Sequence, residues 1–115
     1  MATLKDSQRQ ERTLAKELGG SVNAGSGNGW VRKGDVRSEK ELWECKVTSA
    51  KSYSLKHADL DTVYKQALMD GRIPIFLIEF LKQGDSFVVL TKDDYMELRE
   101  QAFGNEATDA KSEVV

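Results

Sequence analysis

The chain has 115 residues, of which 39% are hydrophobic and 31% charged, and its formal net charge is −2. This length suits a single domain with a real core, and no apolar run approaches the roughly 20 residues of a membrane span. One cysteine, Cys45, and one histidine, His57, argue against an internal disulfide, a zinc site and a Cys-His or Ser-His nucleophile pair. Residues 1–10 lack a signal-peptide core, so we expect an intracellular, cytoplasmic protein, compatible with a viral or prokaryotic origin.

The charges are divided unevenly along the chain. Residues 1–57 carry 11 Lys and Arg against 7 Asp and Glu, a balance of +4. Residues 58–115 carry 6 against 12, a balance of −6. This asymmetry predicts a basic face and an acidic back, although an acidic last helix and tail explain the same division.

Hydrophobic periodicity and turn residues divide the chain into alternating helices and strands. In chain order we expect a helix at 4–18, strands at 21–24, 31–36 and 41–48, a helix at 57–70, strands at 73–80 and 86–90, and a helix after Thr91. Gly19-Gly20 ends the first helix. The order predicts an α/β fold.

The second half of the chain contains the most apolar segment. Residues 73–80 form a nearly continuous apolar run, which is typical of a strand covered on both faces. In the last helix we expect Tyr95, Leu98 and Ala102 to face inward. Residues 104–115 are polar and acidic and are predicted to be a flexible tail, which leaves 1–103 as the single domain.

The strand at 41–48 divides its side chains between two faces, because successive residues of a strand point to opposite sides. One face is apolar and expected to be buried, and the other ends in a carboxylate and an ammonium group. The apolar face carries Trp43, Cys45 and Val47, and the other carries Leu42, Glu44 and Lys46.

These charges, together with Asp35 upstream, indicate a metal-dependent nuclease site. Two carboxylates, Asp35 and Glu44, can share a hard divalent cation. Lys46 beside them can orient water or offset developing negative charge. The pattern is also common on solvated strand faces, where paired charges contribute little; Asp109 and Lys111 in the tail have the same spacing.

Two polar segments are candidates for DNA contacts. Residues 25–29 contain three glycines, whose amides, with Ser26 and Asn28, can hold a phosphate, although a plain turn fits as well. Residues 49–56 suit phosphate contacts and nucleotide stacking, or a bland surface loop. The candidate DNA-binding residues are Ser26, Gly27, Asn28, Arg32, Lys33, Lys51, Tyr53 and Lys56.

Taken together, these motifs resemble the PD-(D/E)XK nuclease superfamily. They are Glu11-x-x-Leu14 in the first helix, the Gly25-Ser26-Gly27 loop, Asp35, and Glu44-x-Lys46 followed by a helix and a strand. Within the superfamily the chain is closest to Holliday junction resolvases of the archaeal and phage type, over about residues 8–90. The resemblance implies a restriction-endonuclease-like fold, in which a mixed central β-sheet is flanked by helices in the order α-β-β-β-α-β-β-α.

The resemblance also implies a role for each motif residue. Asp35 and Glu44 would bind Mg²⁺, for which Mn²⁺ can substitute, with the backbone carbonyl of Cys45 as a further ligand. Glu11 would approach the metal from the first helix, directly or through water. Lys46 would orient the attacking water or stabilise charge on the phosphate. Ser26 would contact the scissile phosphate or its neighbour.

The implied activity is a structure-selective endonuclease of DNA recombination and repair, which resolves branched DNA by phosphodiester hydrolysis and leaves 5′-phosphate ends. A C2 homodimer would place two identical sites on a four-way junction; residues 73–80 and the last helix are its candidate interfaces, with the core of the monomer as the alternative place for both. The alternatives are a restriction- or repair-type nuclease of the same fold, a non-catalytic module that binds branched DNA, and an unrelated small α/β interaction protein.

The sequence departs from the family pattern at two places. Gly34 precedes Asp35 where the motif has proline, a change that removes no chemistry because proline supplies none. The Gln-x-x-x-Tyr element of RecB-like exonucleases is also missing, since Gln66 is followed four residues later by Asp70. The second departure argues against an exonuclease and favours the resolvase branch.

Overall fold

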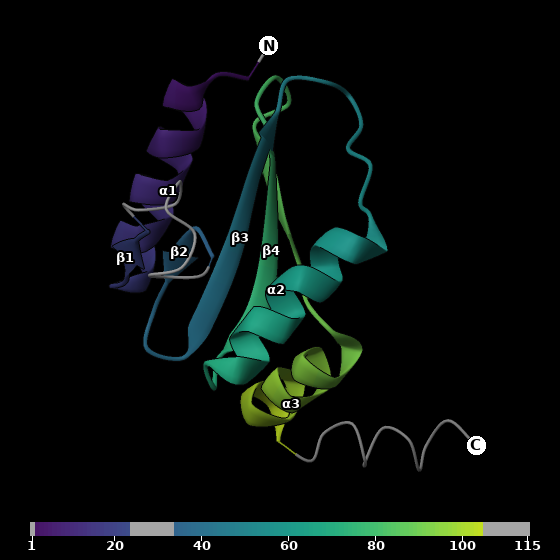
Figure 1. Ribbon diagram of the computed structural model, residues 1–115. Helices are drawn as coiled ribbons and strands as arrows, with labels where there is room; N and C mark the ends of the chain where they lie inside the picture. The colour runs from purple at the N-terminus through teal and green to yellow at the C-terminus, as the bar shows by residue number, and fades with distance from the viewer. Residues whose placement is uncertain (1, 24–33, 105–115) are drawn as a thin grey trace, which may run out of the picture.

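The computed structural model describes residues 2–23 and 34–104, and it has the α/β element order expected from the sequence (Figure 1). The elements are α1 (Leu4–Leu18), β1 (Ser21–Val22), β2 (Val36–Arg37), β3 (Glu41–Thr48), α2 (His57–Met69), β4 (Ile73–Phe80), β5 (Asp85–Val89) and α3 (Lys92–Phe103). β2 begins after Asp35, so that residue lies in the turn before the strand. No helix within the described ranges is long and apolar enough to cross a bilayer.

The five strands form one mixed sheet in the order β1-β2-β3-β4-β5. β3 and β4 are parallel and in register from Glu41 opposite Ile73 to Thr48 opposite Phe80, and the other neighbours are antiparallel. Parallel neighbours need a crossover connection, which α2 supplies here. The general class predicted from the sequence, a mixed sheet flanked by helices, is therefore confirmed.

The core has two parts, one on each face of the sheet. Beneath α1 lie Leu14, Ala15, Val36, Trp43, Cys45, Ile75 and Leu77, and beneath α2 lie Val63, Phe76 and Ile78. Alternate residues of β4 belong to opposite parts, which confirms that this strand is covered on both faces. It also lies between β3 and β5 in the sheet, so residues 73–80 are core of the monomer and are not an exposed interface.

Specific capping residues mark both the start and the end of α1. Thr3 and Asp6 form a capping box, in which the Asp6 carboxylate accepts from the Thr3 amide at 2.8 Å and the Thr3 hydroxyl accepts from the Asp6 amide at 3.3 Å. At the other end, Gly19 has φ 65°, a left-handed conformation that glycine adopts without strain. These two ends fix the length of the helix that carries Glu11.

The inward orientation predicted for α3 is wrong. The helix has no buried residue, and Tyr95 and Leu98 are 47% and 41% exposed; Ala102 is exposed as well. α1 and α2 already pack on the two faces of the sheet, so neither face is left for α3 to cover. Figure 1 shows α3 at the lower end of the sheet, below α2. Its apolar side chains are therefore an exposed surface of the monomer.

Candidate active site

The turn before β2 places Asp35 beside the central strand β3. Gly34 has φ 75°, and a Cβ atom there would lie 2.7 Å from Cδ1 of Leu42. Proline is restricted to φ near −65°, so the residue found before the aspartate in the family motif does not fit this backbone. The Asp35 amide donates to the Trp43 carbonyl at 2.9 Å, and the Asn23 side chain donates to the Gly34 carbonyl at 2.9 Å. These contacts hold the turn in place.

The Asp35 carboxylate lies at the edge of β3, where it accepts a hydrogen bond from the Cys45 amide at 2.8 Å. Among the described residues, β2 pairs with β3 only at Trp43 and Leu42, so Cys45 lies beyond the paired stretch. The N–H and C=O groups of one strand residue project from the same edge. The Cys45 carbonyl therefore projects from the edge at which Asp35 lies, as expected of a further oxygen ligand.

Glu44 is the second carboxylate of the site. It is half-buried, and its Oε2 atom lies 3.4 Å from Nζ of Lys46. Burial and then the Asp35 carboxylate raise the pKa of Glu44 to about 7, against the opposing effect of Lys46. Asp35 and Glu44 are thus close enough to repel one another, and a cation bound between them would relieve that repulsion.

Lys46 is the cation of the site. Burial lowers the pKa of its ammonium group, but the Glu44 carboxylate and Tyr53 outweigh burial, and the net pKa lies above its usual value. Lys46 is therefore charged at neutral pH. An ammonium group suits charge stabilisation and the orientation of water, whereas it cannot accept a proton as a general base.

Glu11 lies in α1, where it is half-buried. Burial and the Asp35 carboxylate raise the pKa of Glu11. Burial also raises the pKa of the Cys45 thiol, and Asp35, Glu11 and Glu44 raise it further. All three predicted acidic residues thus contribute to the negative field at the Cys45 thiol. The same field suppresses the thiolate, so Cys45 is not a nucleophile.

The donor set brought together at this edge consists of oxygen atoms. It comprises the carboxylates of Asp35 and Glu44 and the carbonyl of Cys45, whereas the carboxylate of Glu11 on α1 does not join them in one metal-binding group. Mg²⁺ prefers oxygen ligands and commonly takes one or two carboxylates while keeping several waters, so the residues present fit this ion. Over residues 2–23 and 34–104, no group of three or more His, Cys, Asp and Glu side chains is arranged to hold a metal ion.

The predicted DNA contacts divide between described and undescribed parts of the chain. Lys51 and Lys56 are exposed in the segment that joins β3 to α2, at the upper right in Figure 1. Tyr53, in the same segment, is half-buried, with its ring centroid 6.2 Å from that of Phe76. Five predicted residues lie outside the described ranges: Ser26, Gly27, Asn28, Arg32 and Lys33.

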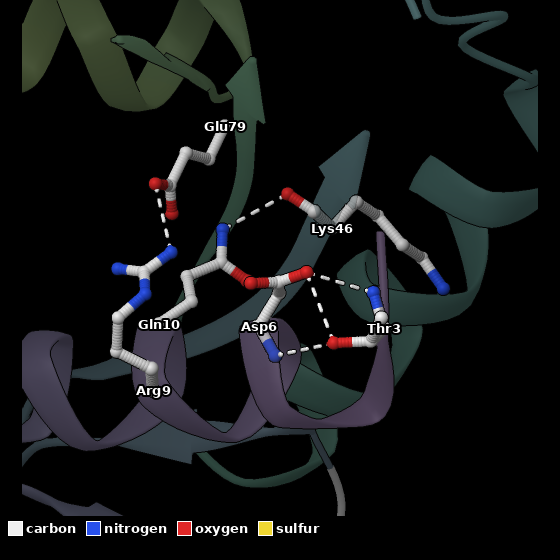
Figure 2. Close-up of polar contacts among 6 residues, drawn as sticks. All are labelled: Thr3, Asp6, Arg9, Gln10, Lys46 and Glu79. Carbon is white, nitrogen blue, oxygen red and sulfur yellow. Dashed lines mark hydrogen bonds and ion pairs between the residues drawn. The ribbon is translucent and has the colours of Figure 1, made fainter. Parts of the chain in front are cut away.

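Two residues near the site were missed from the sequence. Asn23 is buried and holds the turn that carries Asp35. Gln10 is 3% exposed, and its Nε2 atom donates to the Lys46 carbonyl at 2.9 Å (Figure 2). A signal for Gln10 was present, because it precedes Leu14 and Leu18 at intervals of four and shares their helix face.

Comparison of the chain with protein-family models, with curated proteins and with solved structures finds no match. A function for the chain therefore has to be argued from its own residues and their geometry.

Proposed function

We propose that the chain is a metal-dependent, structure-selective DNA endonuclease that hydrolyses phosphodiester bonds at branched DNA, with the four-way Holliday junction as its main substrate. One observation carries the proposal: Asp35, Glu44 and Lys46 meet at the edge of β3 beyond the residues paired with β2. The Asp35 carboxylate raises the pKa of Glu44, and the lysine is 3.4 Å from Glu44. This is the composition that phosphodiester hydrolysis with a divalent cation requires.

The fold supports the same assignment. The order of helices and strands is the one implied by the resemblance to PD-(D/E)XK nucleases, and the parallel pair β3–β4 lies at the centre of the sheet. We therefore propose a restriction-endonuclease-like fold for this chain. The turn before Asp35 departs from the motif, because the positive φ of Gly34 excludes the motif proline.

The residues of the site have distinct roles in the proposed reaction. Asp35 and Glu44 would hold Mg²⁺, or Mn²⁺ in its place, with Glu11 contributing directly or through water. When bound, the ion would supply Lewis acidity that activates water and offsets charge on the phosphate. Lys46, held as a cation by Glu44, would orient the water or stabilise the negative charge that develops on the phosphoryl oxygens.

DNA recognition would rest on shape and phosphate contacts. Lys51 and Lys56 are exposed in the segment that leaves β3 just after Lys46. Lysines in this position can contact the phosphates beside the scissile bond, and such contacts give affinity without reading sequence. Tyr53 would pack against the sugar or base that follows.

We further propose that the protein acts as a C2 homodimer, because a four-way junction presents two related strands for cutting. The apolar side chains of α3 are the surface that a second copy would cover. They are those of Tyr95, Met96, Leu98 and Phe103, which are between 41% and 53% exposed. Residues 73–80, the other interface considered from the sequence, are occupied in the core.

The test is cleavage of a synthetic four-way junction beside linear duplex and single-stranded DNA of the same sequences, in Mg²⁺ and in EDTA. We expect paired, symmetric nicks with 5′-phosphate ends on the junction alone, and no cutting in EDTA. Cutting of all three substrates would retain the nuclease and contradict the junction preference. Tight junction binding without cutting would instead favour a non-catalytic binding module.

A further inference from the structure

Three charged residues form a cluster where the end of α2 meets β2. The guanidinium groups of Arg37, in β2, and Arg72, just before β4, both donate to Oδ2 of Asp70, the C-cap residue of α2. The distance from Nη1 of Arg72 to Oδ2 of Asp70 is 2.5 Å. Two positive charges thus share one carboxylate, which leaves these three residues with a net charge of +1.

The cluster lies on the face of the sheet that carries the candidate active site. Successive strand residues point to opposite faces, and Val36 and Cys45 belong to the core beneath α1. Their neighbours Arg37 and Glu44 therefore both lie on the opposite face. Arg37 pairs with Leu42, which is two residues, or about 7 Å along the strand, from Glu44. A DNA strand on this face with one phosphate at Glu44 can therefore place a neighbouring phosphate near Arg37.

An open hollow of about 480 Å³ lies beside the two arginines. Both arginine side chains line it, together with Ser38 and Glu39. The side chains of Arg37 and Arg72 are only 20% and 22% exposed, so solvent screens their charges less than those of fully exposed side chains. Glu39 is exposed to water, and its carboxylate opposes the arginines only from the rim. The hollow therefore suits an anion.

The guanidinium group of Arg72 is held in place and retains donors for a further acceptor. Its Nε atom donates to the Ser38 carbonyl at 2.9 Å, and its Nη1 atom donates to Asp70. A guanidinium group has five N–H donors in a planar fork that matches the oxygens of a phosphate. The Nη2 amino group of Arg72 is therefore available beyond these two contacts. Because the contacts already orient the side chain, a phosphate would order it little further.

We propose that Arg37 and Arg72 form a phosphate-binding site, which holds a phosphodiester group of the DNA near the scissile one. Asp70 orients both arginine side chains and competes with the phosphate for them. The site deepens the proposed nuclease function and rests on it. It adds a second anchoring point on the active-site face, beyond the DNA contacts predicted at residues 26–33 and 51–56.

Asp70→Asn separates this site from an ion-pair cluster that only joins α2 to β2. Asparagine keeps the shape of the C-cap side chain but lacks the charge that competes for the arginines. We expect the variant to bind a four-way junction in Ca²⁺ about two- to fivefold more tightly than the wild type, the factor that corresponds to a surface ion pair. Asp61→Asn removes the carboxylate of an exposed pair with Lys65 on the same helix. It is the matched control and should bind as the wild type does.

Arg72→Gln removes the positive charge and keeps an amide donor for the Ser38 carbonyl. We expect the slope of log affinity against log salt to fall by about 1, because one phosphate contact is lost. Arg9→Gln is the matched control, since it breaks an arginine–glutamate pair with Glu79 on the α1 side of the sheet (Figure 2). That variant should keep the wild-type slope.

A junction in which one neutral methylphosphonate replaces a phosphate locates the contact. The replacement is moved one nucleotide at a time through the strands that flank the junction centre. At the contacted position the wild type should lose affinity, whereas Arg72→Gln should lose nothing further, because both changes remove the same interaction.

Three results would overturn the phosphate site. They are Asp70→Asn binding no more tightly than Asp61→Asn, an unchanged salt slope in Arg72→Gln, and losses that multiply at every methylphosphonate position. If Arg72→Gln shows no cooperative thermal unfolding, the comparison of Asp70→Asn with Asp61→Asn decides. A wild type that binds no junction would contradict the proposed function and this site together. A wild type that binds and cuts, with variants that show none of the expected changes, would overturn the phosphate site alone.

Discussion

The carboxylate of Asp35 accepts a hydrogen bond of 2.8 Å from the backbone amide of Cys45. This bond joins the turn before β2 to the strand that carries Glu44 and Lys46, and it does so at the edge where a cation would bind. One oxygen of Asp35 thus holds the carboxylate in place while the other can serve as a ligand. The same side chain has a structural contact and a proposed chemical one, and a substitution can separate them.

Asp35→Asn should remove metal-dependent cutting and keep the fold. Asparagine retains an oxygen that can accept from Cys45, so the turn is preserved, but it lacks the negative charge that holds a divalent cation. We expect junction cleavage to fall at least about 100-fold, the effect of losing one strong electrostatic contribution to catalysis, with junction affinity unchanged. Asp59→Asn, at an exposed position in the first turn of α2, is the control. Cutting by Asp35→Asn at the wild-type rate would show that the site is misassigned.

Lys46→Ala should lower the cleavage rate by two to three orders of magnitude, because one preorganised charge at a transition state is worth about 3 kcal/mol. Lys46→Arg keeps the charge and should retain part of the rate. The matched control is Lys65→Ala, which removes the lysine of an exposed pair with Asp61 on α2 and should cut normally. Single-turnover kinetics on a junction measure all three variants. An unchanged rate in Lys46→Ala would exclude this lysine from the mechanism.

The sequence predicted those parts of the fold that repeat locally. Alternation along residues 41–48 correctly placed Trp43 and Cys45 in the core, and the apolar run at 73–80 correctly indicated a strand covered on both faces. The sequence also predicted that Asp35, Glu44 and Lys46 lie near one another. This prediction was possible because Glu44 and Lys46 belong to one strand and Asp35 to the turn before β2, which pairs with that strand.

The parts of the fold and of the site that the sequence did not predict depend on contacts between segments that are distant in the chain. Gln10 acts on Lys46 across 36 residues and Asn23 on Gly34 across 11, and no local period encodes such pairs. The orientation of α3 was mispredicted because its apolar residues show that a surface needs covering, without showing that both sheet faces already have a helix. The sequence shows that Gly34 replaces the motif proline, but only the backbone shows why: φ is 75°, a value that proline cannot adopt.

The raised pKa of Glu44 predicts a pH-dependent stability in the absence of metal. Because the pKa is about 7 in the folded protein against 4.5 for the unperturbed group, protonated Glu44 contributes stability fully below pH 4.5, and this contribution is lost as pH rises through 7. The Glu44 side chain is 26% exposed, and solvent screening reduces the effect to about 1–2 kcal/mol.

Glu44→Gln mimics the protonated side chain at every pH, so in EDTA we expect this variant to be about 1–2 kcal/mol more stable than the wild type at pH 8. The two should be equally stable at pH 4.5. Urea denaturation at both pH values measures the difference, and Glu39→Gln, at an exposed turn, controls for loss of a carboxylate elsewhere. A wild type as stable as Glu44→Gln at pH 8 would mean that Asp35 and burial do not oppose ionisation of Glu44.

Lys51→Ala should weaken junction binding and flatten its dependence on salt. A lysine that contacts a phosphate displaces a counterion, so its loss reduces the slope of log affinity against log salt by about 1. Lys16→Ala, an exposed lysine in the last turn of α1, is the control and should keep the wild-type slope. Binding titrations in Ca²⁺ from low to physiological salt measure both. An unchanged slope in Lys51→Ala would place this residue away from the DNA.

The exposed side chains of α3 predict a dimer that a single charge can dissociate. A helix of 12 residues with nothing buried gains little from packing in the monomer, and isolated helices of this length are marginal in water. A second copy would bury Leu98, now 41% exposed, and Leu98→Glu would place a charge in that interface.

We expect the wild type to have twice the 12.9 kDa chain mass by light scattering and Leu98→Glu to be monomeric. Leu4→Glu makes the same change at a residue that is 74% exposed on α1, and it should stay dimeric. A monomeric wild type would contradict the dimer, and a dimeric Leu98→Glu would place the interface elsewhere. If the dimer is needed for paired incision, Leu98→Glu should still nick single strands of the junction, because Asp35, Glu44 and Lys46 all belong to one chain.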